Sequence, residues 1–242
     1  MTTDASTGAG VSVIIACRNE QEMIARCVSS VRDALPAAEI LVVDGGTDRT
    51  IEIVSAMAQS DPLIRPIRNH GDRGKGHAIK TGIAEARHDV IAQFDADLQF
   101  AATDLPALLQ PVLAGECSLC IGSRFLPNSS RHGYKGIATR DFGNRFLAFL
   151  TSCLTGHRRT DVTTGMKAWT REAIELIDFR DDAYSYEVEI IVRAHRLGLR
   201  VLDIPVEYAS RTAGESMHAG SLHVAKAGLV IIAKSIAARF RS

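Results

Sequence analysis

Two aspartates separated by one residue are the clearest candidates for chemistry in this chain of 242 residues. Asp95 and Asp97, with Gln99 two positions further on, follow the apolar run at 90–92, which predicts a buried strand. Carboxylate and amide oxygens suit Mg²⁺ or Mn²⁺, and such an ion commonly bridges a carboxylate and a substrate diphosphate. An isolated Asp-x-Asp is often only a solvated turn, but ligands bind at strand ends in open α/β sheets. We therefore expect a metal site at Asp95, Asp97 and Gln99.

Three further polar segments, at 17–20, 44–48 and 70–76, each follow a predicted strand. In a parallel sheet these strand ends meet at one edge, so the segments are expected to line one cleft. The alternative is that the first two segments only cap helices and that the third is a turn. Their joint placement favours a ligand site.

Each of these segments has side chains suited to a nucleotide. A buried carboxylate such as Asp44 can accept a hydrogen bond from a base. Gly74 and Gly76 permit close approach of the backbone to a ligand, and a helix that begins there favours anions. Arg73 and Lys75 can neutralise the charge of a diphosphate.

The elements that must position these residues alternate between strands and helices. The predicted strands are 11–16, 40–43, 63–67, 90–94 and 118–121, and the predicted helices are 20–34, 47–59, 74–86 and 104–114. This alternation predicts an α/β fold with a mostly parallel sheet that is flanked by helices. Further on we expect a loop over 127–136, helices over 137–154 and 186–197, short strands over 166–169 and 201–204, and a last helix over 221–240.

Composition narrows the class of protein. The chain is 46% hydrophobic, enough for a sizeable core, and its formal net charge of zero argues against nucleic acid as a partner. Residues 1–10 lack the features of a signal peptide and are predicted to be a disordered lead-in, and no apolar run is long enough to cross a bilayer. Five cysteines without a secretion signal favour reduced thiols in the cytoplasm, with Cys117 and Cys120 as buried structural residues rather than half of a zinc site.

The motifs together resemble family 2 glycosyltransferases with the GT-A fold. The resemblance rests on Val-Ile-Ile-Ala-Cys-Arg-Asn-Glu, Val-Val-Asp-Gly-Gly-Thr-Asp-Arg-Thr, Gly-Lys-Gly and Asp-Ala-Asp-Leu-Gln, in this order over residues 11–99. Later segments are similar to the dolichyl-phosphate mannosyltransferase-like branch: Gly122-Ser-Arg124, Asp161-Val-Thr-Thr-Gly165-Met-Lys, Tyr186-Glu-Val-Glu189 and Arg211-x-x-Gly214-x-Ser216. The implied GT-A domain spans 11–220, followed by the amphipathic helix of 221–242.

The resemblance implies roles for individual residues. Asp44 would contact the base and Glu20 the nucleoside, while Asp95, Asp97 and Gln99 would hold the metal on the diphosphate. Phosphate oxygens of the acceptor or the donor would be bound by a second group, which consists of Arg124, Arg140 and Arg211, with Asn144 and Ser216 nearby. Each arginine has an alternative as a solvated side chain or a partner of a carboxylate.

Two departures from the family pattern bear on the substrates. The loop from Asp44 to Asp48 is one residue shorter than usual, which leaves guanine and uracil both open for the base. Ser216 is followed by Met217 where the family often has lysine, so an acceptor-phosphate cation is missing or supplied by His218. A general base is needed for a hydroxyl acceptor but not for a phosphate, and the sequence leaves open whether Glu187 or Glu189 takes such a part.

The predicted C-terminal helix has an apolar stripe flanked by lysine and arginine. Such a helix either lies in a membrane interface or packs on the domain or a partner subunit. We expect a cytoplasmic enzyme with peripheral contact to the inner face of the membrane.

The resemblance implies a metal-dependent, inverting transfer of a sugar from a GDP- or UDP-linked donor to a polyprenyl phosphate. One alternative is transfer to a soluble hydroxyl acceptor in small-glycoside or antibiotic biosynthesis. Two others are a nucleotide-sugar-binding module and a nucleotidyltransferase. The set of Asp95, Asp97 and Gln99 argues against the first of these, and the absence of a glycine-rich loop after the first predicted strand argues against the second.

Overall fold

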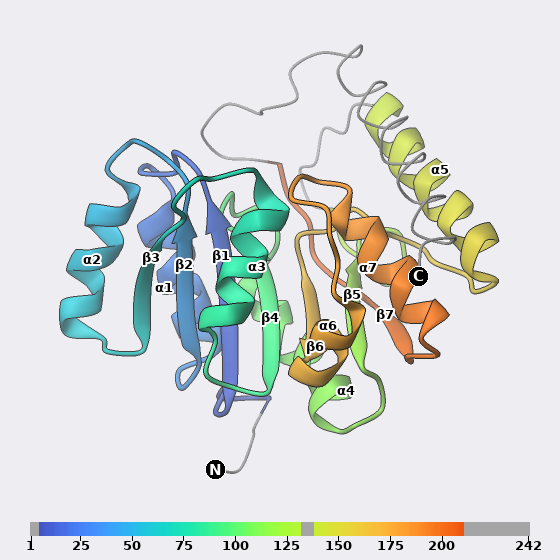
Figure 1. Ribbon diagram of the computed structural model, residues 1–242, viewed down its shortest axis with the longest axis horizontal. Helices are drawn as coiled ribbons and strands as arrows, with labels where there is room; N and C mark the ends of the chain where they lie inside the picture. The colour runs from blue at the N-terminus through green and yellow to red at the C-terminus, as the bar shows by residue number, and fades with distance from the viewer. Residues whose placement is uncertain (1–4, 132–137, 211–242) are drawn as a thin grey trace.

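The computed structural model describes residues 5–131 and 138–210, with only the backbone described for 138–140 (Figure 1). Within this part of the chain, strands form one sheet in the order β3-β2-β1-β4-β6-β5-β7. The strands are β1 (Val11–Cys17), β2 (Glu39–Asp44), β3 (Ile64–Arg68), β4 (Val90–Asp95), β5 (Leu119–Ser123), β6 (Lys167–Thr170) and β7 (Val201–Pro205). Only β6 runs antiparallel to its neighbours. The predicted mostly parallel α/β sheet is therefore confirmed.

Helices cover both faces of this sheet (Figure 1). They are α1 (Ile24–Ala34), α2 (Thr50–Ser60), α3 (Lys75–Glu85), α4 (Leu105–Leu113), α5 (Ala138–Thr155), α6 (Arg171–Ile177) and α7 (Tyr186–Arg196), with a short 3₁₀ helix, η1 (Ala102–Asp104). Side chains of α1, α2 and α4 pack on one face, and those of α3, α5, α6 and α7 belong to the core on the other face. Because both faces are covered, the strands are apolar on both sides.

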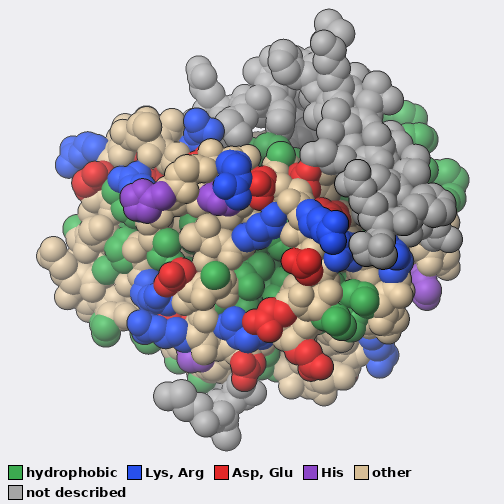
Figure 2. Space-filling view, viewed as in Figure 1, with side chains coloured by type: hydrophobic (Ala, Val, Ile, Leu, Met, Phe, Trp, Pro, Cys, Tyr) green, Lys and Arg blue, Asp and Glu red, His purple; other side chains and the backbone are tan. Residues whose placement is uncertain are grey.

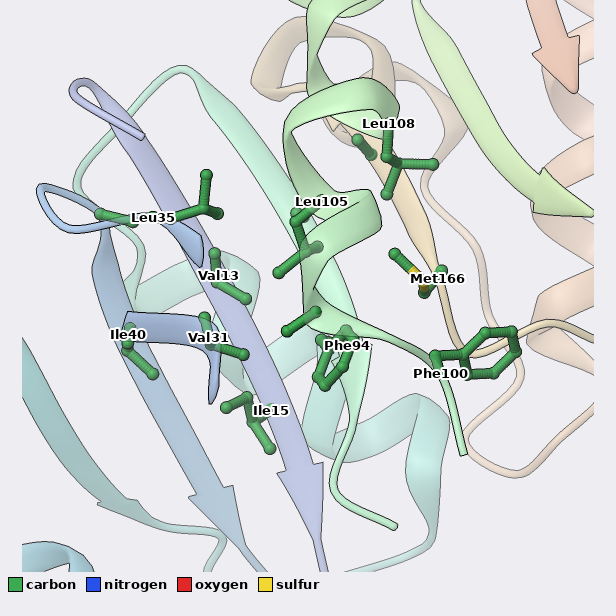
Figure 3. Close-up of a cluster of buried hydrophobic side chains, with 14 of the residues drawn as sticks. Val13, Ile15, Val31, Leu35, Ile40, Phe94, Phe100, Leu105, Leu108 and Met166 are labelled. Carbon is green, nitrogen blue, oxygen red and sulfur yellow. The ribbon is translucent and has the colours of Figure 1, made fainter. Parts of the chain in front are cut away.

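The two hydrophobic cores follow from the alternation of side chains along each strand. Val13 and Ile15 of β1 point to the face covered by α1 and α4, where they lie near Phe94 and Leu105 (Figure 3). Ile14, between them in sequence, points to the opposite core with α3 and α7. The period of two places successive residues of a strand on opposite faces, so one apolar run supplies both cores.

Three local features differ from the sequence prediction. Helix α1 begins at Ile24 rather than near residue 20, because the Glu20 carbonyl accepts from the N–H groups of Met23 and Ile24 in a turn. Helices η1 and α6 were not predicted, since helices this short carry little periodicity. Residues 5–10, expected to be disordered, pack at the base of the sheet, where the Thr7 carbonyl accepts from the N–H of Ala37 at 2.7 Å. None of these differences alters the order of the sheet.

The order of strands reverses at β1, which lies between β2 and β4. Asp95, the last residue of β4, is in register with Ala16, and Asp44, the last residue of β2, is in register with Cys17. Because β4 and β5 both run antiparallel to β6, they point in the same direction, and the segment after Ser123 also leaves at this edge. Such a switch point is where α/β sheets bind ligands, so the fold brings the predicted site residues to a favourable position.

Candidate active site

A buried ion cluster lies at the carboxyl end of β4. The Lys75 Nζ atom is 2.7 Å from Asp95 Oδ1 and 3.0 Å from Glu187 Oε1, so one ammonium joins α3, β4 and α7. The side chain of Asp95 is 23% exposed, whereas that of Glu187 is only 6% exposed. Burial alone would lower the pKa of Lys75, but the two carboxylates outweigh it and hold this pKa well above its ordinary value. Lys75 therefore remains a cation within the site.

The glycines on either side of Lys75 serve the protein itself rather than a ligand. The N–H groups of Gly76 and His77 donate to the carbonyls of Ala183 and Asp182, at 3.1 and 3.0 Å, and this caps the start of α3. A Cβ atom at Gly76 would collide with the backbone of 181–183, and Gly74 has a φ of 125°. Two of the N–H groups at this helix start are therefore bound by backbone carbonyls of the protein rather than directed at a ligand.

Arg73, the other basic residue predicted to contact a diphosphate, extends to the surface. Its Nε atom is 2.6 Å from Asp182 Oδ2, and its side chain is 62% exposed. The same carboxylate group also binds Lys80 at 2.8 Å. These contacts strengthen the connection between α3 and the segment before α7, so the backbone around Lys75 is held on two sides.

The predicted metal ligands follow one another in a tight turn after β4. Leu98 has a φ of 54°, a left-handed conformation that is uncommon outside glycine and often found at functional sites. Asp97 Oδ1 accepts from the N–H of Gln99 at 3.2 Å, and Gln99 Nε2 donates to the Ala209 carbonyl at 3.3 Å. This turn places the side chains of Asp95 and Asp97 on one short segment of chain.

The residues at this turn fit a divalent cation. Two carboxylates supply hard oxygen donors, and the ammonium of Lys75 is a cation already bound to one of them. Gly165 lies directly against the Asp95 carboxylate, where a Cβ atom would collide with it. Among the described residues no group of three or more His, Cys, Asp or Glu side chains is arranged to hold a metal. A metal here would therefore complete its coordination with water and ligand oxygens, as Mg²⁺ commonly does.

A cavity of about 410 Å³ opens between the loops after β1 and β2. It is lined by Asn19, Glu20, Gln21, Glu22, Met23, Thr47 and Asp48. The two loops are joined by reciprocal hydrogen bonds: Asn19 Oδ1 accepts from the N–H of Thr47 at 2.8 Å, and Asp48 Oδ2 accepts from the N–H of Gln21 at 3.1 Å. Glu20 thus lies in a preformed cavity beside the end of β1.

Asp44, the last residue of β2, is fully buried and is not among the residues that line this cavity. Its Oδ1 atom accepts from the N–H of Gly46, and its Oδ2 atom is 2.8 Å from Arg68 Nη1. Burial raises the pKa of Asp44, although the Gly46 hydrogen bond and the Arg68 guanidinium counteract it. Arg68 was not singled out from the sequence, because nothing in the pattern indicated that the end of β3 faces Asp44.

Arg124 forms a second buried ion pair at the same edge of the sheet. Its Nε and Nη2 atoms contact the two oxygens of Asp161 at 2.6 and 2.8 Å, and Phe100 and Tyr208 flank the guanidinium. Of the alternatives left open for this arginine, the structure shows a partner of a carboxylate. Thr163 Oγ1 donates to Asn144 Oδ1 at 3.0 Å, which connects Asn144 of α5 to the Arg124 region.

Several predicted residues lie outside the described part of the structure. The backbone of Arg140 belongs to α5, one turn before Asn144, but its side chain is not described. Arg211, Ser216 and the predicted C-terminal helix over 221–242 also lie outside the described residues.

Two buried polar residues behind the ion cluster were not singled out as site residues in the sequence. Lys167 of β6 is fully buried, its ammonium donates to the Thr164 carbonyl, and burial lowers its pKa. Gln93 of β4 is also fully buried and accepts from the hydroxyl of Tyr186 at 2.9 Å. A lysine and a glutamine within apolar strands were the available signals, since buried polar side chains need partners.

The strand order and the polar site at the carboxyl edge agree with the predicted GT-A fold. A family model described as "Glycosyl transferase family 2" matches residues 12–177, which is more than half of the chain. The chain therefore belongs to glycosyl transferase family 2, and it is a glycosyltransferase, as its motifs predict.

Several relatives with assigned names are similar to this chain. The glycosyltransferase AglD of Haloferax volcanii is 33% identical over 84% of this chain, although the chain spans only about a third (34%) of that protein. An undecaprenyl-phosphate mannosyltransferase of Micrococcus luteus is 29% identical, with 95% of this chain and 96% of that protein covered. A polyprenol monophosphomannose synthase of Mycolicibacterium smegmatis is 30% identical, with 86% of this chain and 81% of that protein covered. The predicted resemblance to the dolichyl-phosphate mannosyltransferase-like branch is thus confirmed.

The fold is also similar to that of a solved structure, glucosyl-3-phosphoglycerate synthase from Mycobacterium tuberculosis, crystallised with Mn²⁺, UDP and phosphoglyceric acid. The TM-score is 0.72 at 22% identity, with 98% of this chain and 81% of that chain covered. In the described residues, no helix combines the length and hydrophobicity needed to cross a bilayer.

Proposed function

We propose that this protein is a metal-dependent, inverting glycosyltransferase that moves a sugar from a GDP- or UDP-linked donor to a polyprenyl phosphate. The observation that carries the proposal is the ion cluster of Lys75, Asp95 and Glu187 at the switch point of a family 2 chain. A nucleotide diphosphate needs positive charge where its leaving oxygen gains negative charge, and this is where the protein holds both a cation and carboxylates for a metal.

Asp95 and Asp97 would hold the metal, with Gln99 completing the turn, and the metal would neutralise the leaving diphosphate. Lys75 supplies a second positive charge from the protein at the same point. Gly165 leaves room for the Asp95 carboxylate, which orients one of its oxygens. These residues together bind and orient the diphosphate, and Mn²⁺, the ion crystallised in the structural neighbour, guides the choice of metal for experiments.

The base and the nucleoside would bind in the cavity between the loops after β1 and β2, beside Glu20. Asp44 would contact the base, with its carboxylate oriented by Arg68 and the N–H of Gly46. Because a carboxylate accepts N–H groups from both guanine and uracil, GDP- and UDP-linked donors are both candidates. Arg73, which is largely exposed, would approach the diphosphate only by leaving Asp182.

The acceptor phosphate would bind on the other side of β4. The names of two relatives support this choice: one is an undecaprenyl-phosphate mannosyltransferase and the other a polyprenol monophosphomannose synthase. Asp161 already neutralises Arg124, so we assign direct phosphate contacts to Arg140, Arg211 and Ser216. Arg124 and Asn144 would position that pocket. A phosphate is ionised at neutral pH and attacks without a general base, which suits an inverting single displacement.

Contact with a membrane surface is supported by α5. Phe142, Phe146 and Phe149 of this helix are 72%, 46% and 64% exposed. Hydrophobic side chains are visible at the right-hand margin of the space-filling view, where α5 lies, while acidic and basic side chains are interspersed on the rest of that face (Figure 2). Exposed apolar patches of this kind mark interaction sites, and we propose a peripheral location on the inner face of the membrane.

The deciding experiment offers radiolabelled GDP- and UDP-sugars with polyprenyl phosphate in detergent, in parallel with a water-soluble hydroxyl acceptor. Labelled lipid that is lost in Arg140→Ala and Arg211→Ala is the expected result. Label on the soluble acceptor, without a lipid product, would instead identify a transferase for small glycosides.

A further inference from the structure

We propose that Lys75 is an internal cation that holds Asp95 until a nucleotide diphosphate arrives, so that metal and nucleotide bind cooperatively. The inference rests on the proposed function, since it concerns the metal and the diphosphate of that reaction. It adds a regulation of the site: the protein protects its own metal ligand while the nucleotide is absent.

One ammonium lies between two carboxylates at this site. Lys75 Nζ is 2.7 Å from Asp95 Oδ1 and 3.0 Å from Glu187 Oε1. A divalent cation that approaches Asp95 Oδ1 therefore meets a positive charge already at contact distance. Two cations within a few ångströms repel each other strongly where water is largely excluded, so the metal and the ammonium compete for one oxygen.

The backbone of Lys75 cannot move far to relieve this competition. The N–H groups of Gly76 and His77 are bound to the carbonyls of Ala183 and Asp182, and a Cβ atom at Gly76 would collide with that segment. The start of α3 and the segment before α7 are therefore packed backbone to backbone. Only the side chain of Lys75 can shift, and Glu187, which is 6% exposed, keeps its ammonium close to the site.

A nucleotide diphosphate resolves the competition because it brings anionic oxygens for both cations. The ammonium can then exchange Asp95 for a phosphate oxygen while it retains Glu187, and Asp95 becomes free for the metal. Each ligand thus raises the affinity for the other, and linkage requires that the effect be reciprocal. The Lys75–Asp95 contact is the structural element that both ligands bias.

Manganese binding, followed by electron paramagnetic resonance, tests this directly. The free protein is expected to bind Mn²⁺ weakly, and UDP or GDP should tighten binding by about tenfold or more. In Lys75→Met, the affinity of the free protein for Mn²⁺ should rise on the order of tenfold, and the effect of the nucleotide should shrink. Lys80→Met is the matched control, because Lys80 lies on the same helix but pairs with Asp182. Its Mn²⁺ affinity should remain within about twofold of the wild type.

The outcomes separate this inference from the proposed function. If wild type binds Mn²⁺ with a nucleotide but Lys75→Met leaves the affinity of the free protein unchanged or lower, the inference is overturned and the proposed function stands. Failure of the wild type to bind Mn²⁺ with either nucleotide overturns both.

Glu187→Gln provides a second arm in case thermal melting shows Lys75→Met to be unfolded. Without the Glu187 carboxylate, the ammonium has Asp95 as its remaining charged partner among the described contacts. Mn²⁺ binding to the free protein should therefore weaken, and unchanged or tighter binding contradicts the inference.

Discussion

Two ion pairs at the carboxyl edge of the sheet differ in their exposure to solvent and in how their charges are shared. This difference distinguishes a ligand site from a pair that stabilises the fold. Arg124 contacts both oxygens of Asp161, and the side chains are 6% and 0% exposed. Lys75 instead shares its charge between Asp95 and Glu187, and its side chain and that of Asp95 are 15% and 23% exposed. A buried bidentate pair uses its charged atoms on each other and offers little to a ligand. A partly exposed pair can exchange one partner for a ligand. Under the proposed function, Arg124 would organise the acceptor side and the Lys75 cluster would meet the donor.

The largest expected effect comes from breaking the buried bidentate pair. Arg124→Met should lower the free energy of unfolding by about 3–5 kcal/mol, because it leaves the Asp161 carboxylate buried without its cation. Urea denaturation measures this change. Glu175→Gln, which removes an exposed i,i+4 partner of Arg171, is the control and should cost under about 0.5 kcal/mol. If the free energy of unfolding falls by less than about 1 kcal/mol in Arg124→Met, this pair does not stabilise the fold as expected.

The proposed metal site beside the partly exposed Lys75 cluster is tested at Asp97. Asp97→Ala should weaken binding of UDP or GDP in the presence of Mn²⁺ by about 10²-fold, because the proposed function makes this carboxylate a ligand of the metal. Calorimetry with and without Mn²⁺ measures this, and the variant should show no metal dependence. Asp89→Ala, at the opposite end of β4 and 97% exposed, should bind as the wild type does. Retained metal dependence in Asp97→Ala would remove this residue from the metal site.

A substitution at Gly165 tests whether the position of the Asp95 carboxylate matters for nucleotide binding. A methyl group in Gly165→Ala would collide with the Asp95 carboxylate, so Mn²⁺-dependent nucleotide affinity should fall by about tenfold or more. Gly143→Ala in α5 is the matched control, since no atom of the described residues lies within 4 Å of its Cβ position, and it should stabilise the helix by up to about 1 kcal/mol. Equal nucleotide affinity in both variants would argue that the position of Asp95 is not critical.

The smallest expected effect concerns His195 and the free energy of unfolding at low pH. Burial, with Arg159 and His157 nearby, lowers the pKa of His195 to about 4, below its ordinary value of 6.5. Between these values the unfolded chain binds more protons than the folded one, so the free energy of unfolding falls as the pH falls from about 6.5 to 4. Because His195 is only about half buried, we expect about 1–2 kcal/mol.

Urea denaturation at pH 7 and pH 4.5 measures the contribution of His195. His195→Gln should lose less stability between these two values than the wild type does. His70→Gln, at an exposed position, should retain the slope of the wild type. An identical slope in His195→Gln would assign the acid sensitivity to other groups.

Much of the fold could be predicted because local patterns carried it. The alternation of apolar strands and helices over residues 11–121 indicated the mostly parallel sheet, and the polar segments after its first strands were expected at one edge, where the structure has them. The short strand β6 was predicted over 166–169, but no local pattern indicated its antiparallel direction, and α6 spans too few residues for a clear period.

The sequence by itself determined the residue types of the site and the family motifs. It also determined that polar segments follow successive strands at one edge of the sheet. Only the tertiary structure decided which charges meet. Lys75 reaches Asp95 and Glu187, 20 and 112 positions along the chain, and Arg124 reaches Asp161 across β5 and β6. Such pairs depend on the packing of distant elements, and a carboxylate is attracted equally by any lysine or arginine until the fold sets the distance and excludes water.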